Sequence, residues 1–542
     1  MTLHFFDAFT CLGPRAQKHP AYRWRLADIR DEMRHCSIAG ALVMTHQSIL
    51  YDPMWANTRL SEALAPYPHL YPIWNLLPWH TGECPEPAAL AARLRERDVR
   101  AVMLCPAANQ WDLLSAVNAP LLEMLQAARR LTILRADQFG GFPDLETLLA
   151  RYPDLPVAIA QAYWTHQRYY TPLLQAYKNL HIMTSHYQAH YGLETLVALG
   201  CEDQVLYSSS APEMAMGAHR TAVDYADLPE ATTAKIAGGN LARLLGVPLP
   251  ETMPNPDEDA LMRAARLGQP QPTTLVDFHV HVLHEGLQGA GGTCVMRDGD
   301  PKGCLPLMAR LGYDIGGAMG WIVNADSVGC NEATAAALDV FPAGWWGLAS
   351  FDVSHYSAED VRRQMAEVYA DPRFIGVKPY PVFGMRYDDE RCAPMWEFAD
   401  ERGFYALIHR TAGDFSEVDN LAGRYPNITW VVAHCGESFA VADLAIACMA
   451  AHANVYAELT LTPVTGGIVE YFVNAVGADR VLYGSDLPMR DPRQQLGWVV
   501  YARLSLAEKK KILGENALRI IADIRGRHPM PLCRPDGDAV TI

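Results

Sequence analysis

The stretch Leu275-Val276-Asp277-Phe278-His279-Val280-His281 predicts a short β-strand that ends in two histidines. Successive side chains of a strand point to opposite faces of the sheet, so residues two apart share a face. His279 and His281 are therefore expected on one face. Two imidazoles placed in this way are typical of half of a transition-metal site, and the remaining ligands must come from elsewhere in the chain.

The sequence repeats itself over about half of its length. Three pairs of segments match, with offsets of 276, 276 and 273 residues: 205–212 with 481–488, 235–240 with 511–516, and 151–154 with 424–427. Offsets that differ by only a few residues indicate two diverged copies with small loop insertions.

A proline-rich segment separates the two copies. Residues 248–272 carry six prolines, which interrupt regular structure at both ends and are typical of a linker. Residues 257–268 predict a short amphipathic helix inside it. We therefore expect a first domain over residues 1–247, a linker over 248–272, a second domain over 273–526 and a tail over 527–542.

Strand-like and helix-like segments alternate within each copy. In the second copy the predicted strands are Thr274–Val280, Ile315–Trp321, Trp346–Phe351, Ile375–Lys378, Tyr405–His409, Thr429–His434, Asn454–Leu459 and Arg480–Tyr483. Helical segments such as Ala358–Tyr369 and Ala393–Arg402 lie between them. Eight alternating units of this length predict a parallel sheet closed into a barrel. The predicted fold is therefore α/β, with two TIM-like (β/α)8 barrels in tandem.

The overall composition restricts the partners and the location. The 542-residue chain has a formal net charge of −16, which argues against a nucleic-acid surface. Its 12 cysteines form no CxxC pair, as expected for reduced thiols in the cytosol. We see no basic leader before an apolar segment and no apolar run of about 20 residues, so we expect neither a signal peptide nor a membrane span. These features predict a cytoplasmic protein that acts on a small molecule.

Polar residues end several of the strands predicted in the second copy. In a (β/α)8 barrel the chemistry takes place at the carboxyl ends of the strands, so these residues are the candidates for a site. They are, in chain order, His279, His281, Lys378, His409, His434 and Asp486.

These motifs, in this order, resemble the amidohydrolase superfamily, specifically the branch that contains aminocarboxymuconate-semialdehyde decarboxylase and related lactonases. The resemblance covers about residues 273–526 and includes the HxH pair, the strand-five histidine, the AHxG sequence at 433–436 and the GSD sequence at 484–486. It implies one divalent metal ion with the ligands His279, His281, His409 and Asp486. It also implies that His434 is the acid/base or oxyanion partner beside a metal-activated water.

The residue types agree with this implication. Neutral imidazoles and one carboxylate suit zinc most closely, with manganese or iron as alternatives, and leave positions open for water. Such an ion lowers the pKa of a bound water from about 15.7 towards about 7. Asp486 could then take its proton.

The remaining polar residues at this end of the barrel have less certain roles. Some superfamily members carboxylate a strand-four lysine to bridge two metals, but we expect Lys378 to place its ammonium on a carboxylate instead. Arg410 and Arg490 could clamp a substrate carboxylate or form ion pairs at the rim. Other candidate substrate contacts are Trp321, Asn324, Asp352, His355, Tyr380, Glu437 and Glu458.

The first copy lacks every implied metal ligand. Phe9 and Cys11 take the two HxH positions, Arg135 and Ser210 take the positions of His409 and Asp486, and Gln161 takes that of the acid/base candidate His434. A phenyl ring cannot bind a metal, a guanidinium is a cation, and a serine hydroxyl is a poor zinc ligand. Three uses remain for this copy: a stand-in for the second subunit of a dimer, packed on the second barrel; a metal-free or regulatory site for a small acid at Arg135, Gln161 and Ser210; or a stabilising partner.

The leading hypothesis is a hydrolase that uses a metal-activated water on an ester, lactone or amide bond of a small organic acid. The same site also allows metal-dependent, non-oxidative decarboxylation of an aromatic or unsaturated acid, because the metal ligands would be unchanged. A third possibility is a binding protein without catalysis. Fold alone does not separate these functions.

Overall fold

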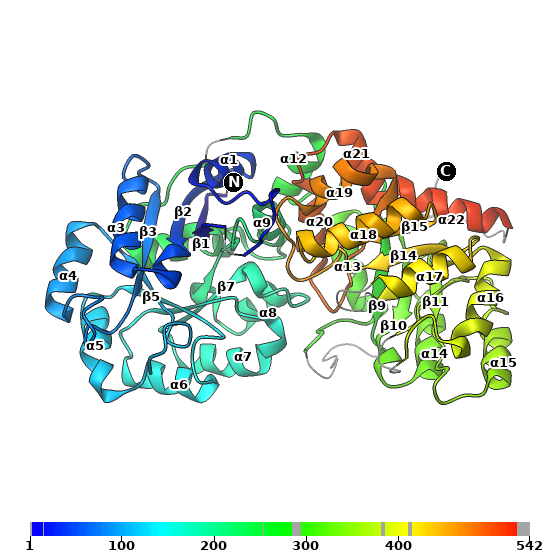
Figure 1. The fold of residues 1–542 in the computed structure, drawn as a ribbon, viewed down its shortest axis with the longest axis horizontal. Helices are drawn as coiled ribbons and strands as arrows, with labels where there is room; N and C mark the ends of the chain where they lie inside the picture. The colour runs from blue at the N-terminus through cyan, green and yellow to red at the C-terminus, as the bar shows by residue number, and fades with distance from the viewer. Residues whose placement is uncertain are drawn as a thin grey trace. The chain divides into compact units, whose positions relative to one another are not determined.

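The computed structural model describes residues 3–14, 16–252, 254–284, 294–380, 385–409 and 415–527. The chain forms two compact units, Met1–Gln188 with Gly192–Glu258, and Ala189–Tyr191 with Asp259–Ile542. Each unit is built on one sheet of eight parallel strands in chain order, with helices around it (Figure 1). The fold is therefore two TIM barrels in tandem, as the alternation of strands and helices predicts.

The first barrel alternates strands and helices from its amino end. Its strands are β1 (Phe5–Leu12), β2 (Ile38–Thr45), β3 (Leu70–Leu76), β4 (Ala101–Leu104), β5 (Leu131–Arg135), β6 (Val157–Ala160), β7 (Leu180–Met183) and β8 (Val205–Leu206). Its helices are α1 (Leu26–His35), α2 (Gln47–Leu50), α3 (Pro53–Leu64), α4 (Pro87–Glu96), α5 (Ala119–Ala127), α6 (Phe142–Arg151), α7 (Gln167–Ala176), α8 (Gly192–Ala198), α9 (Met216–Asp224), α10 (Glu230–Ala234) and α11 (Asn240–Leu245).

The second barrel has the same order of elements. Its strands are β9 (Val276–Val282), β10 (Ile315–Gly320), β11 (Trp346–Ala349), β12 (Phe374–Val377), β13 (Tyr405–His409), β14 (Thr429–Ala433), β15 (Val455–Glu458) and β16 (Val481–Leu482). Its helices are α12 (Ala260–Arg266), α13 (Pro301–Leu311), α14 (Ser327–Leu338), α15 (Ala358–Val368), α16 (Ala393–Arg402), α17 (Ser416–Arg424), α18 (Phe439–Ala451), α19 (Ile468–Val476), α20 (Pro492–Val500), α21 (Leu506–Lys510) and α22 (Asn516–Arg527). All eight strands predicted for this copy are present, with ends that differ by no more than two residues.

The segment between the barrels contains a short helix. Helix α12 begins after Asp259, whose side chain accepts hydrogen bonds from the backbone N–H groups of Leu261 and Met262 at 2.9 Å each. Lys509 donates to the same carboxylate at 2.6 Å, which ties the start of α12 to the second unit. This helix lies within the stretch predicted to be a linker and matches the amphipathic helix expected there.

Hydrogen bonds beyond the last strand close each sheet. In the second barrel, Phe278 of β9 donates its backbone N–H to Tyr483 at 3.1 Å, and Asp486 donates to His279 at 2.8 Å. Both acceptors are backbone carbonyl groups on the opposite segment. The residues after β16 therefore lie against the first strand of this barrel, which brings side chains from the two ends of the domain together.

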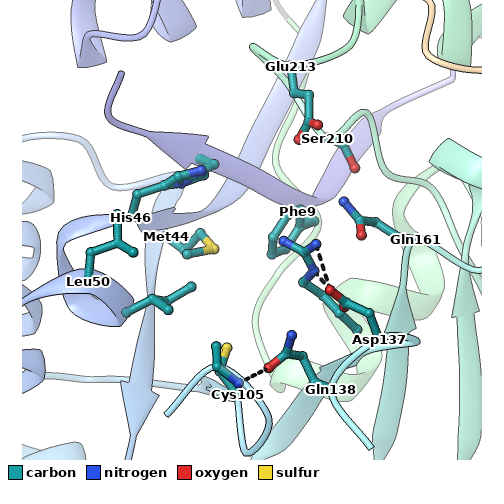
Figure 2. Close-up of a pocket in the computed structure, with 14 residues that line it drawn as sticks. Phe9, Met44, His46, Leu50, Cys105, Asp137, Gln138, Gln161, Ser210 and Glu213 are labelled. Carbon is teal, nitrogen blue, oxygen red and sulfur yellow. Dashed lines mark hydrogen bonds and ion pairs between the residues drawn. The ribbon is translucent and has the colours of Figure 1, made fainter. Parts of the chain in front are cut away.

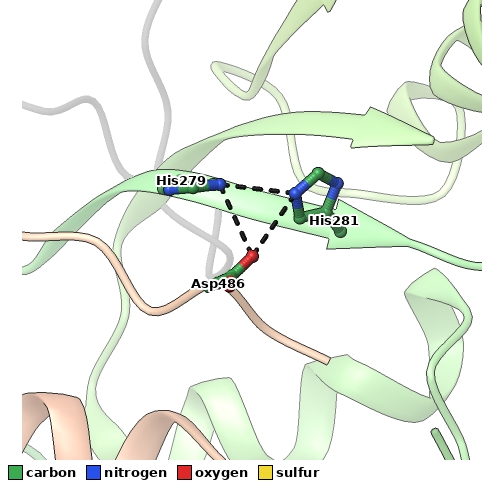
Figure 3. Close-up of side chains that lie close together, drawn as sticks. All are labelled: His279, His281 and Asp486. Atoms are coloured by element: carbon green, nitrogen blue, oxygen red, sulfur yellow. Dashed lines mark hydrogen bonds and ion pairs between the residues drawn. The ribbon is translucent and has the colours of Figure 1, made fainter. Parts of the chain in front are cut away.

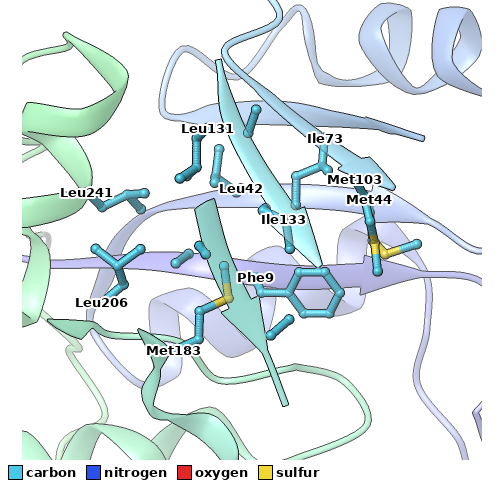
Figure 4. Packing of buried hydrophobic residues seen from close by; sticks show 14 of the residues in the cluster. Phe9, Leu42, Met44, Ile73, Met103, Leu131, Ile133, Met183, Leu206 and Leu241 are labelled. Atoms are coloured by element: carbon cyan, nitrogen blue, oxygen red, sulfur yellow. The ribbon is translucent and has the colours of Figure 1, made fainter. Parts of the chain in front are cut away.

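The interior of the first barrel is filled with aliphatic and aromatic side chains. Phe9, Leu42, Ile73, Ile133 and Met183 belong to one buried cluster inside the ring of strands (Figure 4). Complete burial of a side chain of this size contributes about 1.5 to 3 kcal/mol. The interior of this barrel is therefore a packed core, and a ligand is expected where the strands end.

Each barrel has a buried asparagine at the same place in the fold. Asn240 donates its side-chain amide to the carbonyl oxygens of Glu202 and Val205, at 2.7 and 3.0 Å. Asn516 makes the equivalent bonds in the second barrel. Each asparagine directly follows a π-helical turn, at Lys235–Gly239 or Lys511–Glu515. This agreement fits the tandem arrangement indicated by the repeated sequence.

Two further properties follow from the described residues. No helix among them is both long and apolar enough to cross a membrane. The cysteines among them are all free and buried.

Candidate metal centre

Three side chains of the second barrel converge at the carboxyl ends of its strands. The Nε2 atoms of His279 and His281 are 3.3 Å apart. Oδ1 of Asp486 is 3.5 Å from the first of these nitrogens and 3.4 Å from the second (Figure 3). Three potential ligand atoms thus form a nearly equilateral triangle, and all three residues are buried. The geometry offers one face of a coordination site.

The backbone around the triangle is fixed by Asp277. Its Oδ1 accepts the backbone N–H groups of His279 and Ser485, both at 3.0 Å, so one carboxyl group joins β9 to the loop after β16. Burial raises the pKa of Asp277 to about 7. Asp486 has a φ of +56°, which a residue with a side chain rarely adopts. The loop therefore holds Asp486 in a conformation that the surrounding structure must impose.

Glu458 supports His279 from behind. It ends β15, is completely buried, and its Oε2 lies 3.0 Å from Nδ1 of His279. Its Oε1 accepts the backbone N–H of Thr460 at 2.7 Å. This arrangement favours a hydrogen on Nδ1 of His279 and leaves the lone pair on Nε2, the nitrogen that faces Asp486. The sequence placed Glu458 among the substrate contacts; its position at the end of a strand was the available signal for a supporting role.

Glycine at position 484 makes room for this support. A Cβ atom at Gly484 would lie 2.7 Å from Cβ of His279 and 2.8 Å from Oε1 of Glu458. Ser208 holds the corresponding position in the first barrel, where neither a histidine nor a glutamate has to be accommodated. The glycine is therefore specific to the barrel that carries the histidine pair.

His434 and His409 lie next to the triangle. His434 directly follows β14 with a φ of +67°, and its Nδ1 lies 2.5 Å from the carbonyl oxygen of Thr460. Its Nε2 is 3.2 Å from Nδ1 of His409. Among the described residues, the side-chain groups close enough to share one ion are His279 with His281 and Asp486, and His279 with His434 and Glu458. His409 is in neither group and its Nδ1 faces His434, so its role as a ligand stays a prediction.

Two buried cations lie beside the carboxylates. Nζ of Lys378, which directly follows β12, is in contact with Nε2 of His279, and the lysine is completely buried. Nη1 of Arg490 pairs with Oδ2 of Asp486, and its Nε donates to Thr462 at 3.0 Å. Burial lowers the pKa of Lys378 and lowers that of Arg490 to about 10. Arg490 thus occupies one oxygen of Asp486 and turns the other towards the histidines.

Burial also sets the protonation of the histidines. It lowers the pKa of His279 well below the usual range, with Lys378 as the next largest influence, and it does the same for His281. Both imidazoles are therefore neutral, which is the form that binds a metal. Two neutral imidazole nitrogens, one carboxylate oxygen and a supporting glutamate fit a divalent transition-metal ion.

Two aromatic residues of the predicted substrate set lie beside these histidines. The ring of Trp321 packs edge-on to His281, with ring centres 4.9 Å apart. The ring of Tyr380 lies 5.2 Å from that of His409. Arg410 lies outside the described residues, and the side chain of Asn324 is not described.

Two other predicted contacts pair with each other. Nδ1 of His355 lies 2.7 Å from Oδ2 of Asp352, and the histidine side chain is 78% exposed. The hydrogen bonds from Ser354 and His355 lower the pKa of Asp352 despite its partial burial.

The first barrel repeats the backbone of this site with other side chains. Arg135 ends β5 as His409 ends β13, and Gln161 follows β6 as His434 follows β14. The φ angles of Gln161 and Ser210 are +59° and +55°, close to those of His434 and Asp486. The unusual backbone is thus present in both barrels, although the ligand atoms are present only in the second.

The supporting residues of the centre are also replaced in the first barrel. Met183 ends β7 where Glu458 ends β15, and Cys105 follows β4 where Lys378 follows β12. Neither replacement can hold an imidazole by a charge-assisted hydrogen bond. The first barrel therefore lacks the residues around the ligands as well as the ligands themselves.

The fold and the site together define the second unit as a TIM barrel with a candidate metal centre at the carboxyl ends of its strands. Residues 276–521 match the family profile described as amidohydrolase. This match lies within the second barrel and covers most of it. No curated protein matches the chain.

Three solved structures are among those that are similar to part of this chain. An uncharacterised TIM-barrel protein of Bordetella bronchiseptica is 19% identical, over 46% of this chain and 99% of its own, with a TM-score of 0.38. A 5-carboxyvanillate decarboxylase of Sphingomonas paucimobilis is 13% identical, over 46% and 100%, with a TM-score of 0.36. A dihydroxybenzoic acid decarboxylase of Polaromonas, solved with bound manganese and an inhibitor, is 15% identical, over 46% and 97%, with a TM-score of 0.36.

Proposed function

We propose that the second barrel is a metal-dependent hydrolase that cleaves an ester, lactone or amide bond of a small organic acid. The observation that carries this proposal is the triangle of His279, His281 and Asp486, whose ligand atoms lie within 3.5 Å of one another. We expect one ion per chain, with Zn²⁺ preferred over Mn²⁺ and Fe²⁺ for this set of ligands.

Different residues around that centre would have different roles in the reaction. A divalent ion bound there would lower the pKa of a water molecule towards about 7 and so supply a nucleophile near neutral pH. Asp486 presents Oδ1 to the site and is held in place through its other oxygen by Arg490. His434 keeps its Nδ1 on the carbonyl of Thr460, so Nε2, which faces Nδ1 of His409 at 3.2 Å, is the nitrogen that would exchange a proton at the reacting bond.

A divalent ion would make this site positive and so favour an acidic substrate, because the side-chain charges around it offset one another. Arg490 and Lys378 place two cations among the carboxylates of Asp486 and Glu458. Lys378 lies beside His279, and its ammonium could pair with a substrate carboxylate when the imidazole nitrogen is occupied by a metal. Trp321 and Tyr380 supply aromatic surfaces for the apolar part of a small acid.

Metal content and turnover test the proposal together. The full chain should be purified without added metal or chelator and analysed for metal by elemental analysis, beside the His279→Ala/His281→Ala double variant. We expect about one ion per chain in the wild type and none in the variant. Hydrolysis of nitrophenyl esters, γ-lactones and N-acyl amino acids should depend on that ion and be absent from the variant.

Assays of the reaction products distinguish hydrolysis from decarboxylation. Carbon dioxide released from hydroxylated benzoic acids, with no cleavage of any ester, lactone or amide, would replace the proposed reaction by decarboxylation at the same centre. Two ions per chain, both lost in the double variant, would contradict a single-metal site and indicate that Lys378 bridges two metals. Absence of metal after incubation with Zn²⁺ or Mn²⁺ would refute both reactions.

A further inference from the structure

The first barrel has a cavity of about 270 Å³ at the carboxyl ends of its strands. The five residues that replace those of the predicted metal site all line it: Phe9, Cys11, Arg135, Gln161 and Ser210. This is the end of the fold at which TIM barrels bind their ligands. The volume lies near the lower limit for small-molecule sites, so the cavity suits a ligand of few atoms.

A cation lies at the end of β5 in this cavity. Arg135 directs Nε and Nη2 to the two carboxylate oxygens of Asp137, each at 3.1 Å. Its third nitrogen, Nη1, makes no hydrogen bond to the residues that the structure describes. One donor of the guanidinium is thus available to a ligand, while the charge is already balanced by Asp137.

An anion from the loop after β8 faces the same cavity. Glu213 lines the cavity and forms no hydrogen bond or ion pair within the described parts of the chain. It lies above Phe9 and beside Ser210 in Figure 2. Burial raises the pKa of Glu213, and the nearby Arg135 opposes that shift. The two opposite charges therefore influence each other without forming an ion pair, which leaves room between them.

The other walls are apolar or neutral. Met44, Ile49 and Leu50 line one side, with Met44 and Leu50 to the left in Figure 2. The side-chain amide of Gln161 also lines the cavity and forms no hydrogen bond to the described residues. The cavity thus combines a hydrophobic wall with an amide and two separated charges.

We propose that this cavity binds a small zwitterion of amino-acid size with an aliphatic side chain. The ammonium group of the ligand pairs with Glu213, its carboxylate accepts hydrogen bonds from Nη1 of Arg135 and from Gln161, and its side chain packs on Met44, Ile49 and Leu50. A ligand with both charges pairs each of these partly buried groups and adds no net charge to the site.

Ligands with a single charge fit this cavity less well. Arg135 is balanced by Asp137, so a simple acid would be repelled by the unpaired carboxylate of Glu213. This modifies the sequence-based alternative of a small acid bound by Arg135, Gln161 and Ser210, in which Glu213 and Asp137 had no part. A simple amine would pair with Glu213 but leave the donor of Arg135 without an acceptor.

The cavity has the character of a binding site. Cys11 is its most nucleophilic residue, and its Sγ lies 2.8 Å from Nδ1 of His46. Burial, followed by the charge of Glu213, raises the pKa of this thiol well above its usual range. A protonated thiol is a weak nucleophile, so the pair serves as part of the wall.

Three related compounds test the proposal directly. L-leucine carries both charges, 4-methylpentanoate lacks its amine, and 3-methylbutylamine lacks its carboxylate. Binding of each to the full-length protein should be measured by isothermal titration calorimetry and by ligand-observed NMR. We expect leucine to bind, and the two analogues to bind on the order of tenfold more weakly or worse, because each leaves one charged group unpaired.

Two variants assign the contacts. Glu213→Gln should weaken leucine on the order of tenfold and abolish its advantage over 4-methylpentanoate. Arg135→Gln should abolish the tighter binding of leucine relative to 3-methylbutylamine. Thermal unfolding of each variant should be recorded, and if either fails to fold, Gln161→Leu provides a neutral change on the same wall that should also weaken leucine.

A control variant tests whether leucine binds in the first barrel. The His279→Ala/His281→Ala double variant should bind leucine as the wild type does, because its changes lie in the second barrel. Binding of 4-methylpentanoate as tight as that of leucine, unaffected by Glu213→Gln, would overturn the proposal in favour of a plain acid site. Failure of all three compounds to bind at millimolar concentration would also overturn it, whatever the second barrel catalyses.

Discussion

The carboxylate of Glu458 should determine how tightly the second barrel binds its metal. Oε2 of Glu458 faces Nδ1 of His279 at 3.0 Å, and its Oε1 is engaged by the backbone and hydroxyl of Thr460. In Glu458→Gln, the amide oxygen should stay with Thr460 because only it can accept those hydrogens. The amide nitrogen would then face Nδ1 of His279.

An amide nitrogen can only donate, so it forces His279 to accept at Nδ1 and to carry its hydrogen on Nε2. That hydrogen occupies the lone pair that would bind the metal. Loss of such a support typically costs 10- to 100-fold in metal affinity. This corresponds to about 1.4 to 2.8 kcal/mol.

The affinity should be measured by competition with a chromogenic chelator for Zn²⁺, using wild type and Glu458→Gln at equal concentration. Asp314→Asn is a matched control, because Asp314 accepts the backbone N–H of Leu275 at 2.9 Å, just before the opposite end of β9. We expect the control to retain wild-type affinity. Wild-type affinity in Glu458→Gln, or an equal loss in the control, would refute the reasoning.

Three further predictions concern packing, hydrogen bonding and pH. Gly484→Ala should weaken metal binding and destabilise the second barrel by about 1 to 3 kcal/mol, because the new Cβ would lie 2.7 Å from Cβ of His279. Unchanged metal content and an unchanged unfolding midpoint would contradict this prediction. Ser208→Ala, at the corresponding position of the first barrel, is the control. Asn516→Ala should lower the free energy of unfolding, measured with denaturant, by about 2 to 4 kcal/mol, because the carbonyls of Ala478 and Val481 lose their donor. Asn240→Ala should lower the stability of the first barrel by a similar amount. A decrease below about 0.5 kcal/mol in either variant would show that water replaces the amide. Burial raises the pKa of Asp7 to about 7, so the protonated carboxyl favours the folded first barrel fully below the unfolded pKa of 3.8, and this contribution is lost as the pH rises through about 7. The urea midpoint of Asp7→Asn should therefore fall less than that of the wild type between about pH 5 and about pH 8, and equal falls in both proteins would count against the raised pKa.

The barrel and the grouping of the three central side chains were predictable from local sequence. Each strand of the second copy is a short apolar segment between helical ones, and a parallel sheet of eight such units closes in only a few ways. Closure brings the carboxyl ends of all strands to one mouth. His279, His281 and Asp486 could therefore be placed together although more than 200 residues separate the pair from the aspartate.

The role of His409, one step away from the triangle, is still open. The sequence made His409 a ligand, and the structure places it against His434, with Nδ1 and Nε2 3.2 Å apart. Its assignment as a ligand stays a prediction that metal binding by His409→Ala would test. A strand pattern gives the face on which a side chain lies, but the rotamer and the neighbour that it reaches depend on packing across the barrel.

The sequence by itself determined the tandem barrels, the different residue types at the candidate ligand positions of the first barrel, and the residue types of the second site. Only the tertiary structure decided which residues support that site and what the first cavity can hold. Glu458 meets His279 across 179 positions of sequence. Asp137 balances Arg135, and Glu213 lines the cavity without an ion pair to any residue that the structure describes. Closure of a barrel brings together segments that are far apart in the sequence. A side chain's hydrogen-bond partners and neighbouring charges come from those segments, so the local sequence pattern does not predict them.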